Sequence, residues 1–165
     1  MLALNLAGMN EFNLVLSDNH LKFLSVFLLM QQRDIIKDEI ERLGRVLGKL
    51  VAMLLELESG GASPQMAREV AEDKFRNELE LDLDELLELN LSNLKAKLDE
   101  LHFQPPHVDQ LGDFLSALAH REENPELRER FFRRALMLYD LAGERSGTYS
   151  MARSDKESAI RAELL

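Results

Sequence analysis

The stretch that decides the fold is NPELRERFFRRALMLYDL, residues 124–141. Asn124 is suited to cap a helix, and Pro125 suits the first helical position, where a backbone N–H has no partner. Glu126–Arg130 and Glu129–Arg133 place acid four residues before base on the outer face. The inner stripe is broad and consists of Leu127, Phe131, Phe132, Ala135, Leu136, Leu138 and Tyr139. Other helices must cover such a stripe, so we expect an all-helical fold.

Composition agrees with one helical domain, or with one domain and a short appendage. The chain has 165 residues, 45% apolar and 30% charged, with only four prolines and eight glycines. A formal charge of −10 argues against nucleic-acid binding. The absence of cysteine excludes disulfides, thiolate chemistry and cysteine-bound zinc. We expect an acidic cytoplasmic protein without cofactors.

Residues 1–29 differ from the rest and are set apart as an apolar N-terminal extension of a domain at 30–165. They carry three charges, and LKFLSVFLLM at 21–30 is almost entirely apolar but too short to span a membrane. They lack the basic start and cleavage site of a signal peptide. Three interpretations stay open: a short helix capped at Ser17–Asn19 that packs on the domain, a non-native extension before a true start at Met30, or a docking element for a membrane or partner.

Two helices should form a hairpin after this extension. The first covers residues 31 to about 58, with Gly44 and Gly48 on one face where a neighbouring helix can approach closely. A turn at 59–64 leads to the second helix, from Pro64 to about Leu79. We expect its inward residues to be Met66, Val70, Ala71, Phe75 and Leu79.

The acidic run ELELDLDELLELN at 78–90 is interpreted as an extended connector and a short helix from about Asp84. An EF-hand calcium loop requires a glycine at its sixth position and alternating oxygen ligands, whereas leucines stand here. We therefore expect a solvated acidic face. Ser92 should cap the next helix, in which Leu94, Leu98 and Leu101 continue a stripe from Leu87 and Leu91.

The HFQPPH run at 102–107 should end that helix, because prolines are excluded from a helix interior. A further helix is expected from His107 to about Arg121, with Val108, Leu111, Phe114, Leu115 and Leu118 inward. The histidines at 20, 102, 107 and 120 have no metal-ligand spacing, so we expect them on the surface or in loops and predict no metal site.

This last hairpin resembles a tetratricopeptide repeat. Phe132, Ala135 and Leu136 match its second helix and Leu111-Gly112 its first, although the spacing is about a turn too long. Arg128 stands at the expected small residue, and Asp140 replaces the closing proline. The resemblance is to a degenerate single repeat.

The chain from about Met30 also resembles small bacterial all-helical proteins of unassigned function with divergent tetratricopeptide-like folds. The segments that carry this resemblance are RDIIKDEIERLGRVLGKL (33–50), LELDLDELLELN (79–90) and ALMLYDLAGERSGTYSMARSDKESAI (135–160). It implies stacked antiparallel helical hairpins in a right-handed superhelix, and no known activity.

The C-terminal part should close this stack. Gly147 should end the long helix. Ser154 with Glu157 forms a capping-box pattern for a last helix, with Ser150 as an alternative cap. We expect that capping helix to cover the final hairpin with Ala159, Ile160 and Leu164.

No catalytic motif is present in the sequence. Phosphate loops, HExxH, GxSxG, dinucleotide turns and Glu-x-x-His are all missing. We therefore expect a non-enzymatic protein–protein interaction module whose concave face binds a protein or peptide. The candidate contact residues for an acidic partner are Arg121, Arg128, Arg133 and Arg134, which pairing with nearby glutamates would also explain. The alternative is a self-associating structural or regulatory protein, such as a homodimer, that uses 21–30 with Gly44 and Gly48.

Overall fold

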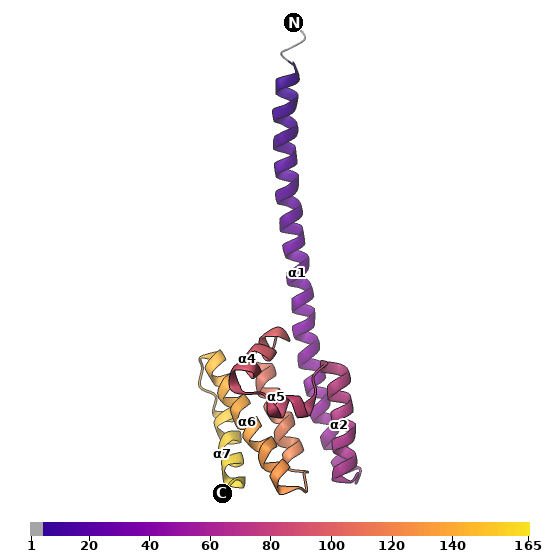
Figure 1. The fold of residues 1–165 in the computed structure, drawn as a ribbon, viewed down its shortest axis with the longest axis vertical. Coiled ribbons are helices and arrows are strands. Elements are labelled where there is room, and N and C mark those ends of the chain that lie inside the picture. The colour runs from indigo at the N-terminus through magenta and orange to yellow at the C-terminus, as the bar shows by residue number, and fades with distance from the viewer. Residues whose placement is uncertain (1–4) are drawn as a thin grey trace. The chain divides into compact units, whose positions relative to one another are not determined.

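The described part of the chain consists of helices and short connections with no strand, which confirms the all-helical class. The structure is a computed structural model that describes the backbone of residues 5–165 and the side chains from Asp18 onward. The chain divides into two compact units, residues 1–39 and 40–165. Its helices are α1 (Asn5–Ser59), α2 (Pro64–Leu79), α3 (Leu83–Glu88), α4 (Leu91–Glu100), α5 (Pro105–Ala119), α6 (Pro125–Ser146) and α7 (Met151–Glu163) (Figure 1).

Helix α1 extends further toward the N-terminus than the sequence predicts. The expected helix from residue 31 to about 58 is present, but it continues without interruption from Asn5. A new helix start at Ser17–Asn19 is therefore wrong. No proline occurs before residue 64, and polar residues such as serine, asparagine and aspartate cost a helix interior only ~0.5 kcal/mol each. The division of the chain at Met30 stays a prediction.

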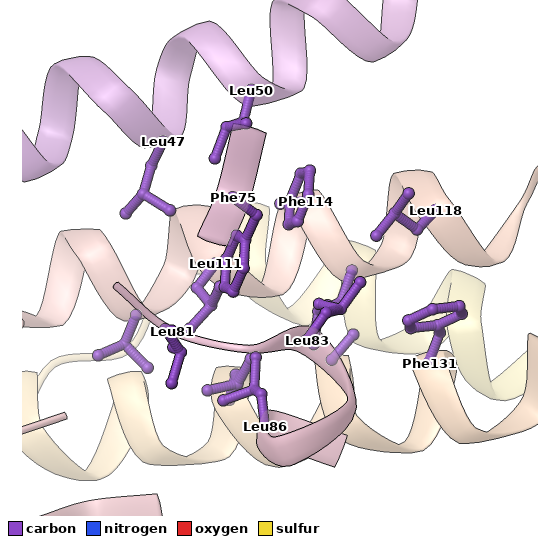
Figure 2. Close-up of a cluster of buried hydrophobic side chains, with 14 of the residues drawn as sticks. Leu47, Leu50, Phe75, Leu81, Leu83, Leu86, Leu111, Phe114, Leu118 and Phe131 are labelled. Atoms are coloured by element: carbon purple, nitrogen blue, oxygen red, sulfur yellow. The ribbon is translucent and has the colours of Figure 1, made fainter. Parts of the chain in front are cut away.

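The core of residues 40–165 is built mainly from leucines and phenylalanines contributed by α1 to α6. Figure 2 shows Leu47 and Leu50 pointing toward Phe75, with Phe114 beside it. The rings of Phe75 and Phe114 are stacked, with centroids 5.3 Å apart. Offset aromatic pairs of this kind add ~1 kcal/mol beyond the apolar area that they bury. This contact joins α2 to α5.

Helix α2 begins and ends as expected but turns a narrower face inward. Ser63 caps it by accepting a hydrogen bond from the Met66 N–H. The expectation that Met66 and Val70 face inward is wrong, because they are 56% and 41% exposed. The buried residues instead follow one row at i,i+4 spacing: Ala67, Ala71, Phe75 and Leu79. Of these, Ala67 was not among the predicted inward residues.

The acidic run after α2 forms the expected connector and short helix. Glu80 adopts the left-handed conformation (φ 53°), and the chain reverses so that Leu79, Leu81 and Leu83 are all buried despite their alternation. Asp82 caps α3 by accepting hydrogen bonds from the Asp84 and Glu85 N–H groups. The pKa of Asp82 is lowered by the Glu85 bond and then by Arg76. One of the acids thus has a capping role.

Two helix starts differ from the prediction. Asn90, not Ser92, caps α4, and the predicted stripe residue Leu91 is 47% exposed. Helix α5 begins at Pro105, two residues before the predicted start at His107. Two prolines fit the first turn of a helix because the N–H groups there have no intrahelical partner. The five predicted inward residues of α5 are all buried.

Helices α5 and α6 pack against each other along their length, and α7 packs on α6 (Figure 1). Asn124 caps α6, and Gly147 ends it in the left-handed conformation (φ 62°), both as predicted. A Cβ built on Gly112 would lie 2.8 Å from Cε1 of Tyr139. The missing side chain of Gly112 therefore lets the Tyr139 ring lie directly on α5.

Helix α7 is present, with a different cap and a smaller covering face. Ser150, the alternative cap, accepts the Arg153 N–H, so the box of Ser154 and Glu157 does not start the helix. Ile160 is buried and Leu164 half-buried, as predicted, whereas Ala159 is exposed. The backbone enters the helix at Met151, which leaves Ser154 inside its first turn.

Of the two glycines expected to allow close packing on α1, only Gly44 does so. A Cβ there would lie 3.4 Å from Nε2 of His107, whereas a Cβ on Gly48 would have no neighbour within 4 Å. Helical periodicity cannot distinguish the two positions, because they differ only in what packs against them.

We expect Gly112→Ala to destabilise the fold and Gly48→Ala to stabilise it. Overpacking against Tyr139 costs about 1–3 kcal/mol, and this outweighs the ~1 kcal/mol that alanine gains in a helix interior. Gly48→Ala has the same helical gain without a clash. Urea unfolding followed by circular dichroism measures both variants. If Gly112→Ala were as stable as Gly48→Ala or more stable, this would contradict the close approach of Tyr139 to Gly112.

Candidate functional site

The most unusual surface of the described chain is the part of α1 from Leu21 to Met30, here called the apolar segment. Eight of its ten residues are large and apolar, and each is well exposed, from 42% at Leu24 to 69% at Phe23. The remaining two are Lys22 and Ser25, and the Ser25 hydroxyl donates to the Lys22 carbonyl at 2.9 Å. Contiguous exposed apolar side chains mark interaction surfaces in soluble proteins.

The apolar segment has one narrow polar side. This side is a row of polar residues at steps of four, three and seven, which we call the polar stripe: Asp18, Lys22, Ser25 and Gln32. Leu29 lies in the same row, between Ser25 and Gln32. The other seven apolar residues span roughly 220° of the circumference at 100° per residue. A helix that is apolar around most of its surface is normally buried. In the part of the chain that the structure describes, no helix has both the length and the apolar character needed to cross a membrane.

Three of the four candidate arginines are already engaged within the chain. Arg121 pairs with Glu58 at 2.8 Å, and Arg133 pairs with Glu129 at 2.6 Å. Arg128 donates twice to the Glu122 carbonyl, at 2.9 and 2.7 Å. Pairing with glutamates thus occurs for two of them, and partner binding by these arginines stays a prediction.

The fourth, Arg134, is buried and connects α6 to the end of α3. Its side chain is 8% exposed, and its Nη2 donates to the carbonyls of Leu87 and Leu89 at 2.7 Å each. These carbonyls lie at the C-terminal end of α3, where intrahelical partners are missing. Burial lowers the pKa of Arg134. These contacts give Arg134 a structural role, and partner binding by this residue stays a prediction like that of the other three arginines.

A polar cleft of about 700 Å³ lies between α2 and the α5–α6 turn. Arg68 and Arg121 line it together with Glu72 and Glu122. Arg68 pairs with both glutamates, at 3.1 Å for Glu122, and lies 5.9 Å from the centroid of the Phe131 ring. The pair of Arg68 and Glu122 leaves no pattern in the sequence, because 54 residues separate its two members. Both arginines of the cleft are thus engaged, Arg68 with two glutamates of the lining and Arg121 with Glu58 of α1.

A second cluster of polar groups joins α5, α6 and α7. The Tyr139 hydroxyl donates to Asp113 at 2.6 Å, and Lys156 pairs with the same carboxylate at 2.7 Å. Burial raises the pKa of Tyr139, and the Asp113 hydrogen bond raises it further. The cluster therefore holds a protonated phenol against a carboxylate.

The ion pair of Arg153 and Asp109 continues this connection between α5 and α7. Two parallel hydrogen bonds of 2.7 Å join the guanidinium to the carboxylate, and the side chains are 10% and 25% exposed. The hydrogen bond to Asp109 raises the pKa of Arg153. Such bidentate pairs are the stronger kind of charge-assisted hydrogen bond. They fix α7 on the helical domain.

Of the histidines, His107 departs from the expected surface position. It is 7% exposed, and its Nδ1 accepts the Gln104 N–H at 3.1 Å, which caps α5. His20 and His120 are exposed, and His120 lies edge-on to Phe132 with ring centroids 5.0 Å apart. His102 adopts a left-handed turn conformation (φ 59°). Among the described residues, no group of three or more histidines and carboxylates is arranged to hold a metal ion.

Comparison with known proteins gives no match to a family model, to a curated protein or to a solved structure.

We expect stability to fall at mildly acidic pH because of His107. Burial lowers its pKa below the ordinary 6.5, so between the two values the unfolded chain binds more protons than the folded chain. The contribution of neutral His107 is complete above pH 6.5 and is lost as the pH falls through the folded pKa. The asparagine oxygen in His107→Asn can accept the same N–H without titrating. Urea unfolding from pH 7.5 to 5 should show a larger loss for wild type than for the variant, and parallel losses would contradict this role.

We expect the Asp109–Arg153 pair to couple α7 to α5 by about 1–2 kcal/mol, above the ~0.2–1 kcal/mol of exposed pairs. A double-mutant cycle with Asp109→Asn and Arg153→Gln measures this free energy in urea unfolding. The exposed pair Glu129–Arg133 provides the matched control cycle and should give less than ~0.5 kcal/mol. Equal coupling in both cycles would show that the bidentate geometry contributes nothing extra.

Proposed function

We propose that the protein is a non-enzymatic interaction module, in which residues 40–165 form a folded helical domain and α1 presents the apolar segment to another protein. The observation that carries this proposal is the exposure of eight large apolar side chains in ten consecutive residues. At ~25 cal/mol per Å² of apolar surface removed from water, covering such side chains is strongly favourable. Protein association is the process that would cover them.

The ion pairs made by the two arginines of the polar cleft support a structural role over a catalytic one. Arg68 and Arg121 each form an ion pair with a glutamate of the same unit, and Tyr139 is tied to Asp113. A catalytic base or nucleophile needs a group that is poised to react with a substrate. These side chains instead connect helices, which favours a scaffold.

We further propose a tetratricopeptide-like arrangement for the helical domain, with α7 as the capping helix. The residues behind the resemblance support it: Phe132 and Ala135 are buried in the α5–α6 hairpin, and Gly112 gives the close approach of the two helices. A bacterial source, a cytoplasmic location and a concave face that binds a peptide remain part of this proposal.

The alternative function is self-association. The exposed apolar segment favours self-association as directly as it favours binding to a different protein, because a second copy of the chain offers the same apolar surface. Of the two glycines first assigned to such an interface, Gly44 packs on His107 of its own chain and Gly48 has open space around it. The apolar segment is therefore the stronger candidate for the contact.

We expect Leu24→Gln with Phe27→Gln to abolish association without unfolding the helical domain. The two side chains are 42% and 49% exposed, and neither belongs to the buried core. Light scattering after size exclusion measures self-association, and affinity capture with the tagged full chain measures binding of other proteins. The wild type should be found in a complex in at least one assay and the double variant in neither.

Circular dichroism and urea unfolding serve as controls that both proteins are folded. Identical behaviour of wild type and double variant in both assays would overturn the proposed function.

A further inference from the structure

We infer that the apolar segment is covered by the same segment of other copies of this chain, in an assembly of more than two copies. This inference rests on the proposed function and names its partner. It follows from the width of the apolar surface on α1, from its area and from the distribution of charge along the chain.

The width of the apolar surface determines how many neighbours each helix needs. The seven apolar residues outside the polar stripe span roughly 220° of the helix circumference. A helix that packs on a globular core has an apolar stripe about 100° wide. In a two-stranded coiled coil the apolar stripe on each helix is narrower still. One neighbouring helix would therefore leave about half of these side chains in water. Two neighbours for each helix cover the band and leave only the polar stripe exposed, as in a bundle of three or more copies.

The exposed area is large enough for a stable interface. Each of the seven apolar side chains outside the polar stripe is between 42% and 69% exposed. Together they present an area on the order of the ~800 Å² that each partner buries in a standard protein interface. The segment can therefore support an assembly without help from the remainder of the chain.

The charge distribution favours a second copy over other occupants. Between Asn19 and Gln32 the only charged residue is Lys22, and Asp18 lies four residues before it on the polar stripe. Identical segments therefore meet without strong repulsion. An anionic lipid surface attracts helices that are rich in lysine and arginine, and this segment has a single lysine. Most of the formal charge of −10 resides in residues 40–165, outside the contact.

The test is sedimentation equilibrium of the purified full chain, with two matched double variants on the same helix. Wild type should have at least three times the monomer mass of 18.9 kDa. Leu24→Gln/Phe27→Gln should be monomeric at concentrations tenfold above those at which wild type is fully assembled. Lys22→Gln/Ser25→Gln, which changes only the polar stripe, should keep the wild-type mass. Circular dichroism establishes that all three proteins are helical.

Raising the salt concentration from 0.05 to 0.5 M should leave the assembly intact or strengthen it, because salt screens the repulsion between the acidic domains and leaves the apolar contact in place. Dissociation by salt would show that charges, not apolar side chains, hold the copies together, and would overturn the inference.

Three further results would overturn the inference. The first is a wild type that stays monomeric or stops at a dimer at all concentrations. The second is loss of assembly in Lys22→Gln/Ser25→Gln. The third is a monomeric wild type that co-sediments with phosphatidylcholine or phosphatidylserine vesicles, when the Leu24→Gln/Phe27→Gln variant does not.

A monomeric wild type that captures a different protein through Leu24 and Phe27 would overturn self-association while the proposed function stands. A wild type that is monomeric and captures nothing would overturn both.

Discussion

The contact between Gly112 and Tyr139 determines how the C-terminal half of the chain is put together. With no Cβ at residue 112, the aromatic ring lies on the α5 backbone, and its hydroxyl reaches the carboxylate of the next residue, Asp113. That carboxylate also accepts Lys156 from α7. One missing side chain therefore fixes the spacing of two helices and, through a shared carboxylate, the position of a third.

Arginine side chains make many of the other connections between helices in residues 40–165. Arg145 of α6 donates to the carbonyls of Lys95 and Phe103 and pairs with Asp99, and Arg134 holds the end of α3. The guanidinium group has five donors in a planar fork, so one side chain can satisfy several acceptors at once. Hydrogen bonds to charged groups contribute about 1.5–3 kcal/mol each, more than a neutral pair. In this acidic chain, the basic residues that a surface site would use are largely occupied in holding the fold.

The apolar segment of α1 stands in contrast to that domain. In residues 40–165 most leucines and all the phenylalanines are buried together, and Arg134 and Tyr139, which lie with them, donate to the backbone of α3 and to a carboxylate of α5. Between Leu21 and Met30 the same residue types are exposed around most of the helix. Apolar surface is favourably removed from water, and the proposed association would do this for the segment as packing does it for the core.

The sequence alone determined the helical fold class, most helix boundaries and the inward face of α5, because these depend on local periodicity and on capping residues such as Ser63, Asn124 and Gly147. It also singled out residues 21–30 as unusual, since a run of apolar residues is visible without a structure.

Only the tertiary structure decided which residues meet across long sequence separations. It buried Arg134 on α3, paired Arg68 with Glu122, and made His107 a capping residue beside Gly44. It also selected Ala67 over Met66 and Asn90 over Ser92. The partners of Arg134 and Arg68 come from elements far away in the chain. The caps at Asn90 and His107 are contacts across three residues, for which capping propensity left near-equivalent choices.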